Sequence, residues 1–165
     1  MLQLITVLVI AALIAVDQLI KFAVLEHLAP IGSYCLIDKV LSLTYIENTG
    51  AAFGSLSSHT ALLSVFTAVV LVVGLIYLLT GKSTSKLAYV CITAIIAGGA
   101  ANLIDRVFRG YVIDYIEPLF VKFAVFNFAD ILVTCGAIIL IIRLIYDIVK
   151  QAEEDKAKKG ESADE

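Results

Sequence analysis

The chain has 165 residues, of which 61% are hydrophobic and only 16% are charged, and its mean hydropathy is +0.99. A soluble domain usually carries about a quarter of its residues as charged side chains, so this composition excludes an ordinary soluble protein. It predicts an integral membrane protein with a single domain. The net charge of −3, without a basic stripe interleaved with aromatic residues, argues against a nucleic-acid partner.

Four apolar segments are each long enough to cross a bilayer, which takes about 20 helical residues. In chain order they cover about residues 2–20, 60–80, 87–104 and 128–149. The first segment has no basic leader and ends in "VDQLIK" rather than at a small-residue cleavage site, so we interpret it as a retained span. We therefore expect one membrane-embedded domain over residues 1–150. Residues 151–165 are poor in apolar side chains, which predicts a disordered tail.

Four spans place both termini on the same side of the membrane. With Arg143 included, that side carries seven of the 12 basic residues, and the opposite side carries five. Because Lys and Arg are enriched in cytoplasmic loops, we expect both termini and the tail to be cytoplasmic. The two longer loops then lie on the outer face of the membrane.

These two outer loops carry strand patterns. Apolar and hydroxyl side chains alternate over residues 41–45, and "NTG" at 48–50 follows with turn-forming residues. "YVIDYI" at 111–116 and "VKFAVF" at 121–126 are short and rich in β-branched and aromatic residues. Backbone groups near lipid must be paired, so we expect these segments to form a small extracytoplasmic β-sheet. The predicted class is membrane α-helical, with four transmembrane helices.

Nucleophilic and metal chemistry find little support in the sequence. The three cysteines form no C-x-x-C pair, and the two histidines show no ligand spacing. We therefore expect no metal and no cofactor. Ser and Cys side chains also lack a plausible histidine base.

Polar side chains gather at the outer ends of the predicted spans. Ionisable groups within or beside spans are costly, and they usually face a partner or a wet cavity. Their convergence at one depth predicts a functional site there. The residues concerned are Asp17, Asn48, Asn102, Asp105, Arg106, Asp114, Asn127 and Asp130.

Most of these residues also have a purely structural interpretation, which the sequence leaves open. Asp17 with Lys21, at i,i+4 spacing, and Asp105 with Arg106 are possible ion pairs. Asn48 is a possible cap of the turn that Gly50 permits. The glycines of "AGGAAN" at 97–102 suit close helix packing. Asn127 and Asp130 are possible N-caps of the fourth predicted helix.

Asp114 and Asp130 are the strongest catalytic candidates. Twelve uncharged residues follow Asp130, and Asp114 lies within an apolar, strand-like hexapeptide. Two carboxyl groups in a poorly hydrated pocket do not both ionise readily, so the pair holds a general base and a general acid together. Such a pair can activate water against a peptide carbonyl and protonate the leaving amine.

Five motifs together resemble bacterial lipoprotein signal peptidase (signal peptidase II) over essentially the whole chain before the tail. They are "DQLIK" at 17–21, "NTGAAF" at 48–53, "GGAANLIDR" at 98–106, "VIDYI" at 112–116 and "FNFAD" at 126–130. Each motif alone is weak. Their order, with each at the outer end of a span, makes the resemblance very specific.

The resemblance implies an aspartic endopeptidase of the bacterial cell membrane with Asp114 and Asp130 as its catalytic pair. It implies cleavage of prolipoproteins just before a cysteine that carries a diacylglyceryl group, on an outer sheet that forms a cradle for the substrate. It also implies inhibition by globomycin. We expect the enzyme to act as a monomer in contact with membrane lipid. The remaining site residues that we expect are Asp17, Asn48, Gly50, Asn102, Asp105, Arg106 and Asn127.

Two other functions are alternatives that fit the sequence less well. An ion-coupled transporter or proton channel would distribute its acids through the membrane depth, whereas here they gather at one face. A scaffold subunit would explain the small residues of "AGGAA" but gives no reason for two neighbouring acids.

Overall fold

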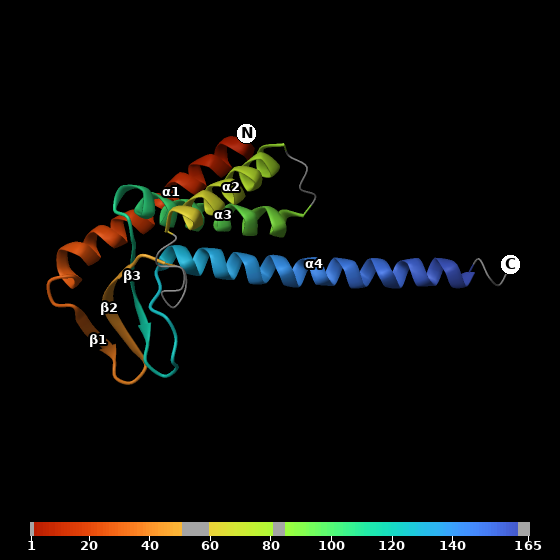
Figure 1. The fold of residues 1–165 in the computed structure, drawn as a ribbon. Helices are drawn as coiled ribbons and strands as arrows, with labels where there is room; N and C mark the ends of the chain where they lie inside the picture. Colours follow the sequence, from red (N-terminus) through yellow and green to blue (C-terminus); the bar gives the residue numbers. More distant parts are fainter. Residues whose placement is uncertain (1, 51–59, 81–84, 162–165) are drawn as a thin grey trace.

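The computed structural model describes residues 2–50, 60–80 and 85–161. In chain order these residues form α1 (Leu2–Ala23), a π-helical turn (Val24–Leu28), β1 (Ser33–Ile37), β2 (Leu41–Asn48), α2 (Thr60–Leu79), α3 (Lys86–Phe108), β3 (Val112–Pro118) and α4 (Phe128–Glu161). The sheet lies at one end of the helices, and both chain termini lie away from it (Figure 1).

Among the described residues, three helical segments are long and apolar enough to cross a membrane. They are Leu2–Leu28, Lys86–Phe108 and Phe128–Glu154. The remaining helix, α2, has 20 residues. At 1.5 Å per residue it is about 30 Å long, which matches the hydrocarbon core of a bilayer. The predicted membrane α-helical class with a small sheet is confirmed, and the predicted count of four spans agrees with this architecture.

The first helix extends beyond its predicted end at residue 20. It continues to Ala23, and the π-helical turn then carries it to Leu28. Asp17 and Lys21 lie inside the helix, and both side chains are completely buried. The two charges do not end the helix because they pair with each other, at 2.8 Å, instead of facing lipid.

The three strands form one antiparallel sheet in the order β1-β2-β3. Strands predicted at 41–45 and 111–116 are therefore confirmed. The strand predicted at 121–126 is wrong, because this segment contributes only an isolated bridge between Phe126 and Ile116. Pro118 ends β3, the following residues turn, and Leu119 donates its N–H to Val40 at 2.9 Å. The chain thus returns to β3 only at Phe126.

Glycine allows α3 and α4 to approach closely near the sheet. A Cβ atom on Gly98 would lie 2.4 Å from the carbonyl oxygen of Ala129, and one on Gly136 would lie 3.0 Å from that of Cys91. Neither position accepts a side chain without moving a helix backbone. The packing role of Gly98 that the sequence left open is therefore present, and it places Asn102, one turn later, beside the start of α4.

The last helix is longer than the sequence predicted. We expected a span over 128–149 followed by a disordered tail, whereas α4 is continuous to Glu161 and projects well beyond the other helices (Figure 1). Residues 151–161 are rich in Ala, Glu and Lys, which favour helix over coil. A Lys150–Glu154 pair at 4.0 Å adds i,i+4 support. Residues 162–165 lie outside the described part of the chain.

Candidate active site

A cavity of about 400 Å³ opens where α3, α4 and the ends of β2 and β3 meet. Its lining residues are of two kinds. The polar group consists of Asn48, Gly50, Asn102, Arg106, Asp114 and Asp130, and the others are Val112, residues 123–126, Ile131, Thr134 and Cys135. Both carboxylates that the sequence selected therefore face the same space.

Asp114 comes from the middle of β3 and is only 2% exposed. Its two carboxylate oxygens each accept one amide N–H, from Asn48 Nδ2 at 2.8 Å and from Asn127 Nδ2 at 2.7 Å. Burial raises the pKa of Asp114 to about 6, and the negative charge of Asp130 acts in the same direction. The two amide donors oppose this rise because they stabilise the ionised form.

Asn127 and Asp130 form a reciprocal cap at the start of α4. The Asp130 backbone N–H donates to Asn127 Oδ1 at 3.0 Å, and Asp130 Oδ2 accepts the Asn127 backbone N–H at 3.1 Å. This is the capping-box arrangement, with asparagine as the N-cap and aspartate three residues later. The other carboxylate oxygen of Asp130 accepts Asn102 Nδ2 at 2.8 Å. The sequence left open whether Asn127 and Asp130 cap the helix or belong to the site. In the structure the two residues do both.

The remaining free N–H groups of the first turn of α4 bind side chains from other elements. Phe128 donates its N–H to the Tyr115 hydroxyl at 3.2 Å, and Ala129 donates to Asp17 Oδ1 at 3.1 Å. Burial raises the pKa of Tyr115 to about 12. The start of α4 is consequently fixed both to β3 and to α1, so that Asp130 has a defined position relative to Asp114.

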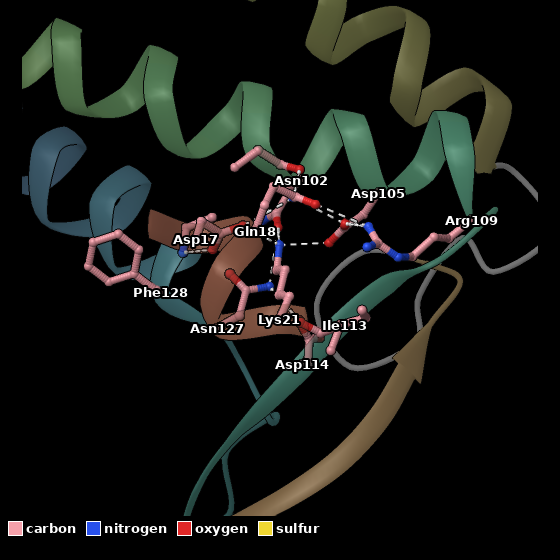
Figure 2. A network of polar contacts seen from close by, with 12 residues as sticks. Asp17, Gln18, Lys21, Asn102, Asp105, Arg109, Ile113, Asp114, Asn127 and Phe128 are labelled. Carbon is pink, nitrogen blue, oxygen red and sulfur yellow. Dashed lines mark hydrogen bonds and ion pairs between the residues drawn. The ribbon is translucent and has the colours of Figure 1, made fainter. Parts of the chain in front are cut away.

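Lys21 occupies the centre of a polar network behind the cavity (Figure 2). Its Nζ atom lies 2.8 Å from Asp17 Oδ2, 2.7 Å from Asp105 Oδ2 and 2.8 Å from Asn102 Oδ1. The Lys21, Asp17 and Asp105 side chains are all completely buried. A buried ammonium therefore connects α1 to α3 and reaches the amide that contacts Asp130.

Asp105 pairs with Lys21 and Arg109 and not with its neighbour Arg106. Gln18 joins this cluster, because its Nε2 donates to Asp105 Oδ1 at 3.2 Å and its Oε1 accepts Arg109 Nη1 at 3.1 Å. The sequence left open an ion pair between Asp105 and Arg106. In the structure each of these residues has other partners. Arg106 lines the cavity and donates from Nη2 to the Gly50 carbonyl at 3.4 Å.

The structure brings all nine predicted site residues together but in two layers. Six of them line the cavity, whereas Asp17, Asp105 and Asn127 lie behind it and hold those that do. The turn role of Asn48 is also present, since its Oδ1 accepts the Gly50 N–H at 2.9 Å. Residues 51–53 of the "NTGAAF" motif lie outside the described residues.

Sequence reasoning missed Lys21, Gln18, Arg109 and Tyr115 as members of the site. The i,i+4 spacing of Asp17 with Lys21 and of Asp105 with Arg109 was a usable signal, because each pair interrupts an apolar helix. No local pattern revealed that the two pairs meet. Within the described ranges, no group of three or more His, Cys, Asp or Glu side chains is arranged to hold a metal ion.

Comparisons with known proteins agree with this architecture. A family model described as "Signal peptidase (SPase) II" matches residues 9–146. A lipoprotein signal peptidase of Caldanaerobacter subterraneus subsp. tengcongensis is 41% identical over 140 residues, which are 85% of this chain and 95% of that protein. One of Clostridioides difficile is 39% identical over 140 residues, 85% of this chain and 94% of that protein.

Solved structures show the same fold. A bacterial membrane enzyme determined by the in meso method at 2.3 Å resolution superposes with a TM-score of 0.78 and 30% identity, over 87% of this chain and 88% of that one. A second, at 1.9 Å resolution, gives a TM-score of 0.75 and 30% identity, over 86% and 93% of the two chains.

Proposed function

Because this chain belongs to the signal peptidase II family of aspartic peptidases, we propose that it removes the signal peptide from prolipoproteins and that Asp114 and Asp130 are its catalytic pair. The bond hydrolysed is the one before a cysteine that carries a diacylglyceryl group. The observation that carries this proposal is the shared cavity. Both carboxylates line it, and Asn127 donates to both of them, from Nδ2 to Asp114 and from its backbone N–H to Asp130.

The chemistry requires one proton between two acids. An ionised carboxylate takes a proton from water as the water attacks the scissile carbonyl, and a protonated carboxyl gives its proton to the leaving amine. Burial raises the pKa of Asp114 to about 6, so this carboxyl keeps a proton to a higher pH than an ordinary aspartic acid does. The amides of Asn48, Asn102 and Asn127 orient the carboxylate oxygens, so the pair has little freedom to rotate.

The lining of the cavity suits both the apolar and the polar parts of the proposed substrate. Phe123, Val125, Phe126 and Ile131 offer contact to apolar side chains of a signal peptide and to acyl chains. Among the polar lining residues, the buried Nε atom of Arg106 has no hydrogen-bond partner in the described part of the chain. It is therefore available to a substrate carbonyl, since an unpaired buried donor is costly.

We place the cavity at the outer face of the bacterial cell membrane, with both termini in the cytoplasm. The distribution of seven basic residues against five supports this orientation. A lipid-anchored cysteine holds the scissile bond at the membrane surface, which positions it without a deep soluble cleft. The proposed enzyme acts as a monomer, and globomycin inhibits it by occupying the cavity.

The test is cleavage of a synthetic signal peptide with a diacylglyceryl-modified cysteine by the detergent-purified protein. We expect Asp114→Asn and Asp130→Asn each to reduce the rate by at least about 100-fold, which is the scale of general acid–base catalysis. Globomycin should inhibit the wild type. The matched control is Asp147→Asn, the same substitution on an exposed turn of α4, and it should retain the wild-type rate.

Melting curves establish that each variant is folded. Full activity in either active-site variant would exclude the two-aspartate mechanism. Absence of cleavage by the wild type would exclude the proposed substrate.

A further inference from the structure

We propose that Lys21 is a positioning residue of the aspartate pair, because its ammonium group fixes the Asn102 side-chain amide with the NH₂ group facing Asp130. This inference rests on the proposed function and deepens it. It assigns a task in the reaction to a residue that does not line the cavity.

The ammonium group of Lys21 can only donate hydrogen bonds. A lysine side chain has three N–H donors and no acceptor. Lys21 has three acceptors around it, from Asp17, Asp105 and Asn102, all within 2.8 Å. Its side chain is completely buried, so no solvent shares these contacts. Only an oxygen can face it, which fixes Oδ1 as the Asn102 atom on that side.

The Asn102 amide has one orientation that suits both of its charged neighbours. With Oδ1 of Asn102 on Lys21, the Nδ2 atom faces Asp130 Oδ1 at 2.8 Å. Rotation of the amide by half a turn would place N–H groups against the ammonium and a carbonyl oxygen against the carboxylate. Both contacts would be repulsive in a buried, poorly screened environment. The cation thus selects the one orientation that supplies a donor to Asp130.

The orientation of the Asn102 amide also affects the other acid, Asp114, through Asn127. Asn127 Nδ2 lies 3.2 Å from Asn102 Oδ1, 2.7 Å from Asp114 Oδ1 and 3.3 Å from the Ile113 carbonyl. Its own Oδ1 is held by the Asp130 backbone N–H. Asn102 Oδ1 therefore accepts from both Lys21 and Asn127. One buried cation orients the first amide, and that amide helps to orient the second.

Lys21 is itself held from two sides. Asp17 lies one turn before it in α1 and also caps Ala129 of α4, whereas Asp105 comes from α3 and binds Arg109 as well. Figure 2 shows the Lys21 side chain directed into this ring of partners. A lone helix-surface ion pair would leave two of the three N–H groups to water. Here the third N–H meets the amide that contacts Asp130.

A double-mutant cycle tests whether Lys21 acts through Asn102. The variants are Lys21→Met, Asn102→Ala and the combination, assayed for kcat and KM on the peptide substrate. We expect Lys21→Met to lower kcat by at least about 10-fold while KM changes by less than about 3-fold, because it removes positioning in the reaction step. The double variant should be no slower than Asn102→Ala within about 3-fold, since coupled residues are non-additive.

The matched control is Arg143→Met, which removes the cation of an i,i+4 ion pair on α4 outside the site. It should leave kcat within about 3-fold of wild type. If Lys21→Met does not fold, the cycle is run in an Asp105→Asn background, in which one charge of each sign is removed.

Two results would overturn the inference. They are multiplicative losses in the double variant, and a Lys21→Met enzyme with wild-type kcat. Neither affects the result for Asp114→Asn and Asp130→Asn, so failure of this inference is distinct from failure of the proposed function.

Discussion

The two ends of α4 carry similar residues in different settings. At the start, the N–H groups of residues 127–130 all bind side-chain oxygens, and both oxygens of Asp130 accept an N–H. Toward the other end, Arg143 pairs with Asp147 at 2.8 Å and Lys150 with Glu154 at 4.0 Å, with side chains between 37% and 60% exposed. Fixed partners and burial, and not the number of charges, therefore distinguish the candidate site from the rest of α4.

The contribution of each polar contact to stability also differs between the two ends of α4. An exposed i,i+4 ion pair on a helix contributes about 0.3–0.5 kcal/mol, because water and salt screen it. Removing a donor from a buried carboxylate costs about 1–3 kcal/mol or more, because the remaining group is left desolvated and unpaired. Substitutions at the two ends should therefore separate clearly.

Asn127→Ala should have the largest effect at the start of α4. It removes the amide donor to Asp114 and the oxygen that caps Asp130. We expect unfolding free energy to fall by about 1–3 kcal/mol and cleavage to fall by at least about 100-fold. Asn127→Asp keeps the capping oxygen but places a third carboxylate against Asp114, so it should remain folded and inactive. Cleavage and melting curves measured on both variants separate these two roles, and an active Asn127→Asp enzyme would contradict them.

Gly98→Ala should have the next largest effect, because it forces α3 away from α4. The added Cβ would lie 2.4 Å from the Ala129 carbonyl, so backbone must move and Asn102 moves with it. We expect a lower melting temperature and at least about a 10-fold loss of kcat, since small misplacements are costly in catalysis. Gly74→Ala is the control, because the nearest neighbours of its Cβ would be side-chain atoms of Ile96, at 3.3 and 3.4 Å, and of Ile92, at 3.9 Å, and not backbone. Equal effects in the two variants would show that the contact with Ala129 is not special.

Asn48→Ala should change the pH dependence more than the maximal rate. Asn48 donates to ionised Asp114 and so lowers its pKa, while burial raises that pKa to about 6. The shared proton is present below this pH and is lost as pH rises, so kcat/KM of the wild type should decline through about pH 6. Without the Asn48 donor the Asp114 pKa rises, and the declining limb should move upward by about one pH unit. An unmoved limb, or a shift to lower pH, would show that this contact does not tune the pair.

Glu154→Gln should have the smallest effect of the four. Its partner Lys150 lies 4.0 Å away, and both side chains are more than half exposed. We expect a change in unfolding free energy of less than about 0.5 kcal/mol and an unchanged cleavage rate. A loss of activity here would break the contrast between the two ends of α4.

The sequence predicted those parts of the fold that depend on contacts between residues close together in the chain. Runs of apolar residues and the alternation over 41–45 are local signals, so the helices and β2 were predictable. The segment at 121–126 has the same composition as a strand, but Pro118 and the turn after it leave only Phe126 beside β3. The extension of α4 past residue 149 was missed because low hydropathy says little about helix propensity.

The candidate site was predictable where a polar residue stood alone in apolar surroundings, as Asp114 and Asp130 do. Lys21 was assigned no task because its spacing from Asp17 also fits an ordinary helix pair. Its other partners, Asn102 and Asp105, lie 81 and 84 positions further along the chain. Contacts across such separations depend on how helices cross, and a single sequence contains no direct signal for that.

The bond between the Ala129 N–H and Asp17 spans 112 positions of the chain and has a consequence for biogenesis. Synthesis delivers α1 to the membrane first and α4 last, so a nascent chain that has inserted through α3 contains Asp17 and Lys21 but not Asp130. The polar cluster is complete only when α4 has inserted and packed beside α1. The peptidase is therefore assembled by the last step of its own insertion, and no truncated translation product that lacks α4 contains a complete pair of acids.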